Sequence, residues 1–398
     1  MIKTTVRQLG QVITGHTPPT SKREFYGNSY PFLKPTDMII GQKYTYVTEE
    51  GYSDLAVQKY KSSLIPKGST CVVCIGTLGE KMSMAHCDLF TNQSINSIIP
   101  SDNYDPHYVY YLLKHNLHRV KALNKGTASG REFVSKSTFL DLEIDVIEDL
   151  SIQKKVAEVL NAYDDLIENN QNQILLLEEA TRRLYKEWFV DFHFPGYEEV
   201  QIVDNIPIGW RRTVLSEIAI INKQSINKTY SYSNIKYVDL GSVSKGHVLG
   251  TTEYSLQDAP GRARRLADDG DVIWGMVRPN LKAYALIQYP AENAVFSTGF
   301  AVITARTVPF TFLYCLTTTE EFVGYLVGCT NGAAYPAVKP SHFEAAKIVV
   351  PDKSTLDKFH IITEPLFREI GVLDEQNNRL VEARDRLLPK LMSGEITL

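Results

Sequence analysis

Residues 366–391 read LFREIGVLDEQNNRLVEARDRLLPKL, in which mostly apolar side chains recur at alternating steps of four and three residues. That spacing is the heptad seam of a coiled coil. Residues 152–188 repeat the rhythm, with one local pair of four-residue steps that would unwind a supercoil slightly. The sequence therefore predicts two long helices that pair along these seams. The positions expected to pair them are Val156, Val159, Tyr163, Leu166, Asn170, Leu177, Leu184, Leu366, Ile370, Leu373, Asn377, Leu380, Leu387 and Leu391.

Two features interrupt the apolar seams. Asn170 and Asn377 each lie near the middle of a seam. An asparagine on a seam often fixes the register of a coiled coil at a cost in stability. A solvent-exposed helix position would account for each asparagine equally well. Pro365 lacks a backbone N–H and predicts a break or a start of the second helix.

The chain carries an internal duplication. Residues 179–184 (EATRRL) resemble residues 382–387 (EARDRL). Two further pairs of segments match in the same order, 66–73 with 268–274 and 126–139 with 331–343. Because all three pairs are about 200 residues apart, they indicate two copies of one unit, a domain followed by a long helix.

The rest of the sequence predicts two mixed α+β domains. Short β-branched runs flanked by Gly, Pro and Asp predict strands, and two apolar runs after them predict short helices. The expected strands are Cys71–Ile75, Ile235–Leu240, Val272–Met276 and Ala301–Ala305, and the expected helices are Tyr108–Leu113 and Thr311–Leu316. The predicted organisation is a domain over 1–150, a long helix over 151–190, a linker over 191–206, a domain over 207–350 and a second long helix over 351–398.

The length of the linker bears on how the helices pair. The first helix would be roughly 60 Å long, and the linker reaches at most about 55 Å. The second domain therefore sits most easily at the C-terminal end of the first helix, and the second helix then buries its seam by running back. The expected fold class is α+β, with two domains separated by two long antiparallel coiled-coil helices and a pseudo-two-fold internal repeat.

Composition limits the possible classes of protein. Apolar residues make up 43% of the chain and charged residues 22%, no apolar run could span a membrane, and the start lacks a signal peptide, so we expect a globular cytoplasmic protein. Cys71 and Cys74 form a lone C-x-x-C in a strand-like run, and we expect structural cysteines rather than a metal site. The net charge is −4, but segments 1–150 and 205–350 are slightly basic, at +1 and +3. This distribution permits DNA binding.

The sequence contains no known catalytic motif. It lacks the Asn-Pro-Pro-Tyr and Asp-Pro-Pro-Tyr tetrapeptides of adenine methyltransferases, and residues 76–81 (GTLGEK) do not have the spacing of a P-loop. The motifs G-x-G-x-x-G, H-E-x-x-H and G-x-S-x-G are absent as well. We therefore predict a protein with no catalytic residues and no metal site of its own.

Several stretches resemble the specificity-subunit family of type I restriction–modification enzymes. The more specific ones are residues 184–192 (LYKEWFVDF) and 206–210 (IPIGW), and residues 15–37 and 387–396 follow the family's order. The resemblance covers nearly the whole chain. The second copy departs from the first because it lacks a clear counterpart of Thr17-Pro18-Pro19, so its DNA-contacting loops are harder to place.

The resemblance implies a function and a set of partners. Such a subunit is not catalytic: each of its two target-recognition domains reads one half of a bipartite, asymmetric DNA target, and the helices set the spacer and dock two adenine-N6 methyltransferase subunits. Restriction subunits with translocase and nuclease parts join this complex of one specificity subunit and two methyltransferase subunits. We expect double-stranded DNA and these subunits as partners, and no membrane. This chain needs no cofactor, because S-adenosylmethionine, ATP and Mg²⁺ are used by the partner subunits.

Contacts to DNA are expected from basic and amide side chains near loops. Arg262-Ala263-Arg264-Arg265 is the strongest cluster, and Arg278-Pro279-Asn280 follows a predicted strand. Ordinary surface charge explains each residue singly. The candidates are Lys22, Arg23, Lys34, Lys125, Arg131, Lys136, Arg262, Arg264, Arg265, Arg278, Asn280, Lys282, Tyr335 and Lys339.

Three other functions stay open on the sequence. One is a coiled-coil scaffolding protein whose two domains do not bind DNA. Another is a self-contained methylase–nuclease, which the missing motifs oppose. The third is the specificity subunit of a type II system with a bipartite site, which differs only in its partners. Binding to random DNA, methyl transfer by the isolated chain and the neighbouring genes would separate them.

Overall fold

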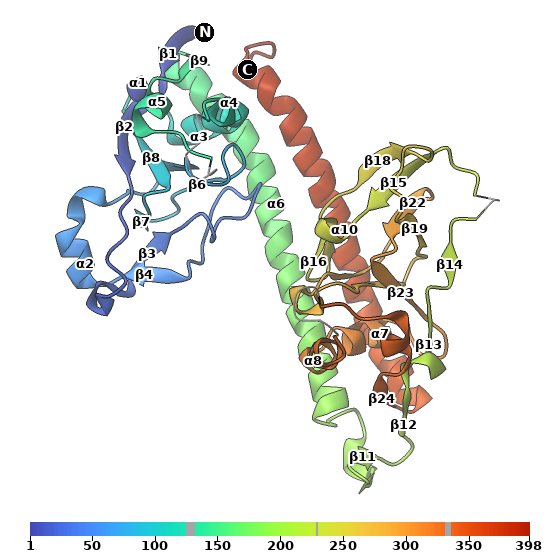
Figure 1. Ribbon diagram of the computed structural model, residues 1–398. Helices are drawn as coiled ribbons and strands as arrows, with labels where there is room; N and C mark the ends of the chain where they lie inside the picture. Colours follow the sequence, from blue (N-terminus) through green and yellow to red (C-terminus); the bar gives the residue numbers. More distant parts are fainter. Residues whose placement is uncertain (125–131, 228–229, 331–335) are drawn as a thin grey trace. The chain divides into compact units, whose positions relative to one another are not determined.

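The computed structural model describes residues 1–124, 132–227, 230–330 and 336–398 (Figure 1). The chain forms two compact units: the first consists of Met1–Asn169 with Asn377–Leu398, and the second of Asn170–Gln376. The long helices α6 (Leu150–Tyr185) and α10 (Lys353–Met392) each contribute to both units. Each unit therefore contains one α+β domain and a segment of both helices, and the predicted α+β class is confirmed.

The first unit contains two small sheets. A four-stranded sheet has the order β2-β8-β5-β6, a three-stranded sheet has the order β4-β3-β7, and β1 pairs with β9. The strands are β1 (Ile2–Thr5), β2 (Gly10–Thr14), β3 (Tyr26–Leu33), β4 (Glu50–Tyr52), β5 (Thr70–Val73), β6 (Met82–Met84), β7 (Phe90–Thr91), β8 (Ile95–Pro100) and β9 (Glu143–Val146). The helices are α1 (Val6–Leu9), α2 (Asp54–Lys59), α3 (Pro106–His115), α4 (Leu117–Ala122) and α5 (Lys136–Leu140), with 3-10 turns η1 (Arg23–Phe25) and η2 (Lys61–Ser63).

The second unit also has a four-stranded sheet, in the order β13-β23-β20-β21, and its other main sheet has five strands in the order β14-β19-β22-β15-β18. Their strands are β13 (Ala219–Ile221), β14 (Gln224–Ser225), β15 (Asn234–Val238), β18 (Thr252–Ser255), β19 (Ala263–Leu266), β20 (Val272–Gly275), β21 (Tyr284–Leu286), β22 (Ala294–Ser297) and β23 (Phe300–Ala305). Three strand pairs complete it: β10 (Ile202–Val203) with β11 (Ile206–Pro207), β12 (Arg211–Val214) with β24 (Lys347–Val350), and β16 (Val243–Ser244) with β17 (His247–Val248). The helices are α7 (Phe310–Thr317), α8 (Glu320–Gly328) and α9 (Pro340–Glu344), with 3-10 turns η4 (Tyr197–Glu199), η5 (Leu215–Glu217), η6 (Leu240–Ser242) and η7 (Pro279–Leu281).

The strand orders show that the two domains share one topology. The sheet β2-β8-β5-β6 corresponds to β13-β23-β20-β21, and the pair β1–β9 corresponds to β12–β24. In the other sheet, β4-β3-β7 corresponds to β18-β15-β22, and both β3–β7 and β15–β22 are parallel pairs. The predicted duplication is therefore confirmed. Within the described residues, strands β14 and β19 have no counterpart in the first domain.

Local sequence signals account for the predicted elements. The Asp105 carboxylate caps α3 by accepting a hydrogen bond from the N–H of Tyr108, and Pro106 occupies the first turn. The predicted helices Tyr108–Leu113 and Thr311–Leu316 lie within α3 and α7. The predicted strands correspond to β5, β15, β20 and β23, with ends that differ by one or two residues.

The two long helices run antiparallel. In the first unit, Asp164 of α6 forms an ion pair with Arg384 of α10 at 2.5 Å, and in the second unit Asn170 donates a hydrogen bond to Gln376 at 3.1 Å. The residue nearer the C-terminus of α6 thus contacts the residue nearer the N-terminus of α10, as antiparallel helices require. Of the residues predicted to pair the helices, Val156, Asn170, Ile370, Leu373 and Leu391 are buried. Val159, Tyr163, Leu177, Leu184, Leu366, Asn377, Leu380 and Leu387 are half-buried.

Two predictions about the helices are wrong. Leu166 is 43% exposed, and its neighbour Ile167 is buried instead, because the buried stripe of α6 follows Leu160, Asp164 and Ile167. Pro365 does not interrupt α10, which continues from Lys353 to Met392. The proline lies on an exposed face, where water can satisfy the carbonyl that loses its N–H partner, and buried residues on both sides hold the helix in place.

The Asp164–Arg384 pair is a buried charge pair inside the first unit. The two side chains are 6% and 3% exposed, and the hydroxyl of Tyr111 donates a further hydrogen bond to Asp164 at 2.6 Å. Burial alone would lower the pKa of Arg384, but the charge and hydrogen bonds of Asp164 raise it. The guanidinium therefore stays charged and serves as the partner of a carboxylate that has little access to water.

We expect Arg384→Met to lower the free energy of unfolding by about 3–5 kcal/mol, because it leaves the Asp164 carboxylate buried without its charge partner. The matched control is Arg386→Met, which removes an exposed partner of Glu382 and should cost less than about 1 kcal/mol. Urea-induced unfolding followed by circular dichroism measures both. Equal stability of the two variants would contradict the importance of the buried pair.

Candidate nucleic-acid interface

The arginine cluster of the second domain lies on and next to β19. This strand pairs with β22 on one side and with β14 on the other. Arg264 is exposed, whereas Arg265 is half-buried and donates a hydrogen bond to the hydroxyl of Ser225 at 3.2 Å. Burial lowers the pKa of Arg265. Within the described residues, Arg262 and Arg264 have no ion-pair partner, so their charges are available to a phosphate backbone.

A second group of candidates surrounds η7. Arg278, just before this turn, donates its backbone N–H to the carbonyl of Pro336 at 2.8 Å. Val277 and Ala337 form a β-bridge, so Lys339 follows a segment that is paired with Met276–Arg278. Asn280 is exposed, whereas Lys282 forms an ion pair with Glu320 at 2.5 Å, which offsets its charge.

One short segment connects these two groups. The N–H of Thr298 donates to the carbonyl of Arg262 at 2.8 Å, and the N–H of Met276 donates to the carbonyl of Gly299 at 2.8 Å. Arg262 and Met276, which lies two residues before Arg278, are therefore hydrogen-bonded to the adjacent residues Thr298 and Gly299. Hydrogen-bonded neighbours in sheets lie roughly 5 Å apart. The fold thus brings together two basic groups that are separate in the sequence.

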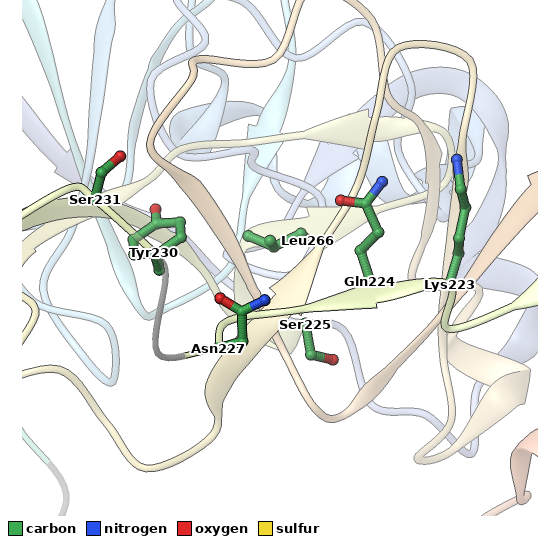
Figure 2. Close-up of a pocket in the computed structure, with 7 residues that line it drawn as sticks. All are labelled: Lys223, Gln224, Ser225, Asn227, Tyr230, Ser231 and Leu266. Atoms are coloured by element: carbon green, nitrogen blue, oxygen red, sulfur yellow. The ribbon is translucent and has the colours of Figure 1, made fainter.

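A polar pocket of about 380 Å³ lies beside β14 (Figure 2). Figure 2 shows Lys223 and Gln224 along this strand, with Asn227 and Tyr230 beyond its end. The Asp268 carboxylate accepts a hydrogen bond from Gln224 at 2.9 Å and lies 3.5 Å from the ammonium of Lys223. These contacts offset the basic charge on this side of β14, so we do not include the pocket in the basic interface.

Three candidates of the first domain, Lys22, Arg23 and Lys34, lie around η1 and just after β3. Lys22 and Arg23 are exposed, each about 5.9 Å from the centre of an aromatic ring, Phe25 and Tyr26 respectively. Lys34 is bound by Glu49 at 2.7 Å and Glu50 at 3.1 Å. Burial would lower the pKa of Lys34, but these hydrogen bonds raise it, so the lysine is charged and neutralised locally.

The other first-domain candidates are less informative. Lys136 is exposed at the start of α5. Lys125 and Arg131 lie outside the described residues, as does Tyr335 of the second domain. The structure therefore groups seven candidates of the second domain, whereas the described candidates of the first domain lie on η1, after β3 and on α5. The seven are Arg262, Arg264, Arg265, Arg278, Asn280, Lys282 and Lys339.

One basic residue next to the η7 group was not among the predicted candidates. Lys245 is exposed at the turn between β16 and β17, and its backbone N–H donates to the carbonyl of Lys282 at 2.9 Å. Lys245 and Gly246 both have positive φ, as a two-residue hairpin turn requires. The Lys-Gly pair between two short β-branched runs is the sequence signal that would have indicated this turn.

The two cysteines of the C-x-x-C motif, Cys71 and Cys74, are buried. Burial raises the pKa of Cys71 to about 12 and that of Cys74 to about 11, so both thiols are protonated near neutral pH. In the described ranges, no cluster of His, Cys, Asp and Glu is arranged to hold a metal ion. Likewise, none of the helices described combines the length and apolar character needed to cross a bilayer.

Comparisons with known proteins agree with a duplicated DNA-specificity architecture. The family model "Type I restriction modification DNA specificity domain" matches residues 2–179. The MjaIX specificity subunit of Methanocaldococcus jannaschii is 28% identical, over 98% of this chain and 92% of its own length. The HindI specificity subunit of Haemophilus influenzae is 38% identical over 34% of this chain and 29% of its own length.

A solved structure shows the same fold. The crystal structure of the type I restriction–modification S subunit from M. genitalium covers 98% of this chain and 96% of its own length with a TM-score of 0.60, at 18% identity. The chain thus has the fold of that solved S subunit, and the DNA-specificity family model covers its first domain and most of α6. Over nearly its whole length the chain is similar to the specificity subunits of type I restriction enzymes.

His247 fixes the second domain to its segments of the long helices. Its Nδ1 lies 3.1 Å from Asp374 of α10, and its Nε2 lies 3.4 Å from Glu178 of α6. The hydrogen bond with Asp374 raises the pKa of His247 against the opposing effect of burial, and the charges of Asp374 and Glu178 raise it further. Burial also raises the pKa of Glu178. Both pKa shifts favour the protonated forms of the two groups, the His247 imidazole and the Glu178 carboxyl.

We expect this contact to make stability pH-dependent. Because the pKa of His247 is higher in the folded than in the unfolded chain, its stabilisation is complete below about pH 6.5 and is lost as pH rises through the folded value. His247→Gln removes the titrating group. The free energy of unfolding of this variant should therefore fall less with rising pH than that of the wild type, and the two losses should differ by on the order of 1 kcal/mol. Urea unfolding from about pH 6 to about pH 9, which covers the titration of a histidine whose pKa is raised, measures the difference. Parallel pH profiles for the two proteins would contradict it.

Proposed function

We propose that this chain is the non-catalytic DNA-specificity subunit of a type I restriction–modification complex, and that each α+β domain reads one half of a bipartite, asymmetric target. One observation carries the proposal: two domains share a scaffold but differ in the elements added to it. The second domain adds β14 and the arginine-bearing β19, whereas the first has α2 and η2 after its corresponding β4. A common scaffold with different additions suits two readers of different sequences.

The partners follow from the family and from the helices. We infer that two methyltransferase subunits dock on α6 and α10, that restriction subunits join them, and that the helices set the distance between the half-sites. Leu175 and Leu176 of α6 are 61% and 71% exposed, and Val372 of α10 is 47% exposed, which fits a surface that a partner covers. S-adenosylmethionine, ATP and Mg²⁺ are assigned to the partner subunits.

Selection from random double-stranded DNA tests the function. The chain, in complex with its methyltransferase subunits, is used to retain DNA, and the retained sequences are determined. We expect two short blocks of different sequence separated by a constant gap, because two linked readers each contribute one block. Retention without sequence enrichment would contradict the proposal and would favour a scaffolding protein.

Arg262→Ala combined with Arg264→Ala should weaken binding of all DNA sequences. Both arginines are exposed without ion-pair partners in the described part of the chain, so we assign them to phosphate contacts. The slope of the logarithm of affinity against the logarithm of salt concentration should fall by roughly 1 for each phosphate that is no longer neutralised. Fluorescence anisotropy over a range of salt concentrations measures this slope.

The matched control is Arg306→Ala. Arg306 is also exposed, but it follows the last residue of β23, at the other end of that strand from Gly299. A strand of this length separates the two ends by roughly 20 Å. Replacement of Arg306 should leave affinity and salt slope nearly unchanged. If both variants behave alike, the β19 arginines are not part of the interface.

A further inference from the structure

Strand β19 contains a β-bulge at Arg264. Ala263 is paired with Ser297 of β22 and Arg265 with Phe296, so β19 advances by two residues where β22 advances by one. A bulge of this kind inserts one extra residue and changes the direction of a side chain, and bulges are over-represented next to active sites. The bulge therefore determines how the arginines of this strand are presented.

The bulge places Arg264 and Arg265 on the same side of β19. Ala263 and Leu266 both pack in the apolar cluster around Ile235, on one face of the sheet. In a regular strand, residues three apart point to opposite faces. The extra residue of the bulge accounts for the spacing of these two apolar residues, and the two arginines between them lie on the other face.

A hydrogen bond tethers the Arg265 side chain to β14. Its Nη1 donates to the hydroxyl of Ser225, the residue paired with it across the two strands, at 3.2 Å. Figure 2 shows the side chains of Ser225 and Gln224 on opposite sides of β14. Arg265 is half-buried, whereas Arg264 is exposed. A side chain that is already held in place loses less conformational entropy when it binds a partner.

The Arg265 guanidinium is partly removed from water without a carboxylate to compensate. Burial lowers its pKa, and no acidic side chain in the described part of the chain opposes this effect. Its Nε is buried and makes no hydrogen bond to the residues that the structure describes. Removing a charge from water costs free energy unless acceptors pair with it. A bound partner can supply further acceptors at the outer nitrogens of the guanidinium.

We propose, on the basis of the function proposed above, that Arg265 reads a guanine in the half-site of the second domain and that Ser225 is its positioning residue. Arginine pairs in two-point fashion with O6 and N7 of guanine in the major groove. Such a contact requires a guanidinium that is held in a fixed direction, as the tether to Ser225 provides. The exposed Arg262 and Arg264, assigned to phosphates, hold β19 against the DNA backbone.

The inferred contact belongs to one half-site. Strand β19 has no counterpart within the described residues of the first domain, so the first domain has no equivalent of Arg265 there. The loss of Arg265 should therefore change the reading of one half of the target and leave the other half as it is. A purely structural role of Arg265 does not predict this asymmetry.

The test uses Arg265→Met in the complex with the methyltransferase subunits. Methionine is long, flexible and apolar, so it fills the space of the side chain without its donors and charge. We expect the preference for a G·C pair at one position of one half-site to fall roughly 5- to 150-fold, while the other half-site is read as before. The salt slope should stay unchanged, because Arg265 neutralises no phosphate. Selection from random DNA and fluorescence anisotropy over a range of salt concentrations measure the two effects.

Two further variants separate reading from folding. Ser225→Ala keeps the arginine but removes its tether, so the preference at the same base pair should fall to a smaller extent. Arg306→Met is the matched control, since it removes the charge of an exposed arginine at the far end of β23. This control should leave the preference and the salt slope unchanged. All three variants should have melting temperatures close to that of the wild type.

The inference is overturned if Arg265→Met keeps the preference of the wild type at every base pair. An equal loss of affinity for all sequences with a salt slope lower by about 1 also overturns it, since that is the behaviour of a phosphate contact. So does a lower melting temperature with weaker reading of both half-sites, which indicates a structural role. If Arg265→Met does not fold, an unchanged preference in Ser225→Ala overturns the inference. A wild-type complex that selects no sequence would instead overturn the proposed function, so the two failures are distinguishable.

Discussion

The buried ion pair between Asp164 and Arg384 shows the constraint on which the rest of the structure depends: the core of each unit requires a helix from the other repeat. In the first unit, Leu388, Leu391 and Met392 of α10 belong to the core of the first domain. In the second unit, Ile174 and Tyr185 of α6 belong to the core of the second domain. Neither repeat can bury its apolar surface without the other, so both must be present and the helices must run antiparallel.

This constraint leaves the elements that are added to the shared scaffold free to differ. Buried positions of the shared sheets and helices are restricted by packing. Within the described residues, strand β19 has no counterpart in the first domain, and it carries Arg264 and Arg265 beside the buried Ala263. One scaffold therefore carries two unlike sets of added elements, which is the property that the proposed reading of an asymmetric target requires.

Three pairs of similar segments were sufficient to predict the duplication. Local patterns of apolar and β-branched residues were sufficient to predict the two long helices and several strands. It failed at Leu166, because the domain that packs on α6 shifts the buried stripe by one residue, and at Pro365, because tertiary packing holds the helix through the proline. The interface was only partly predictable. Basic residues are visible in the sequence, but the acidic partners that neutralise Lys34 and Lys282 come from elsewhere in the fold. No local signal indicates that Arg278 is left-handed, since that conformation favours glycine.

The most direct measurement of the central claim is methylation mapping of DNA from cells that carry the complete system with a hybrid chain. In the hybrid, residues 2–146 replace residues 211–350, so that β1 and β9 take the places of β12 and β24, which pair in the same register. If each domain reads one half-site independently, the methylated target should consist of two copies of a single half-site sequence. A hybrid complex that still methylates the asymmetric target of the wild type would contradict the account.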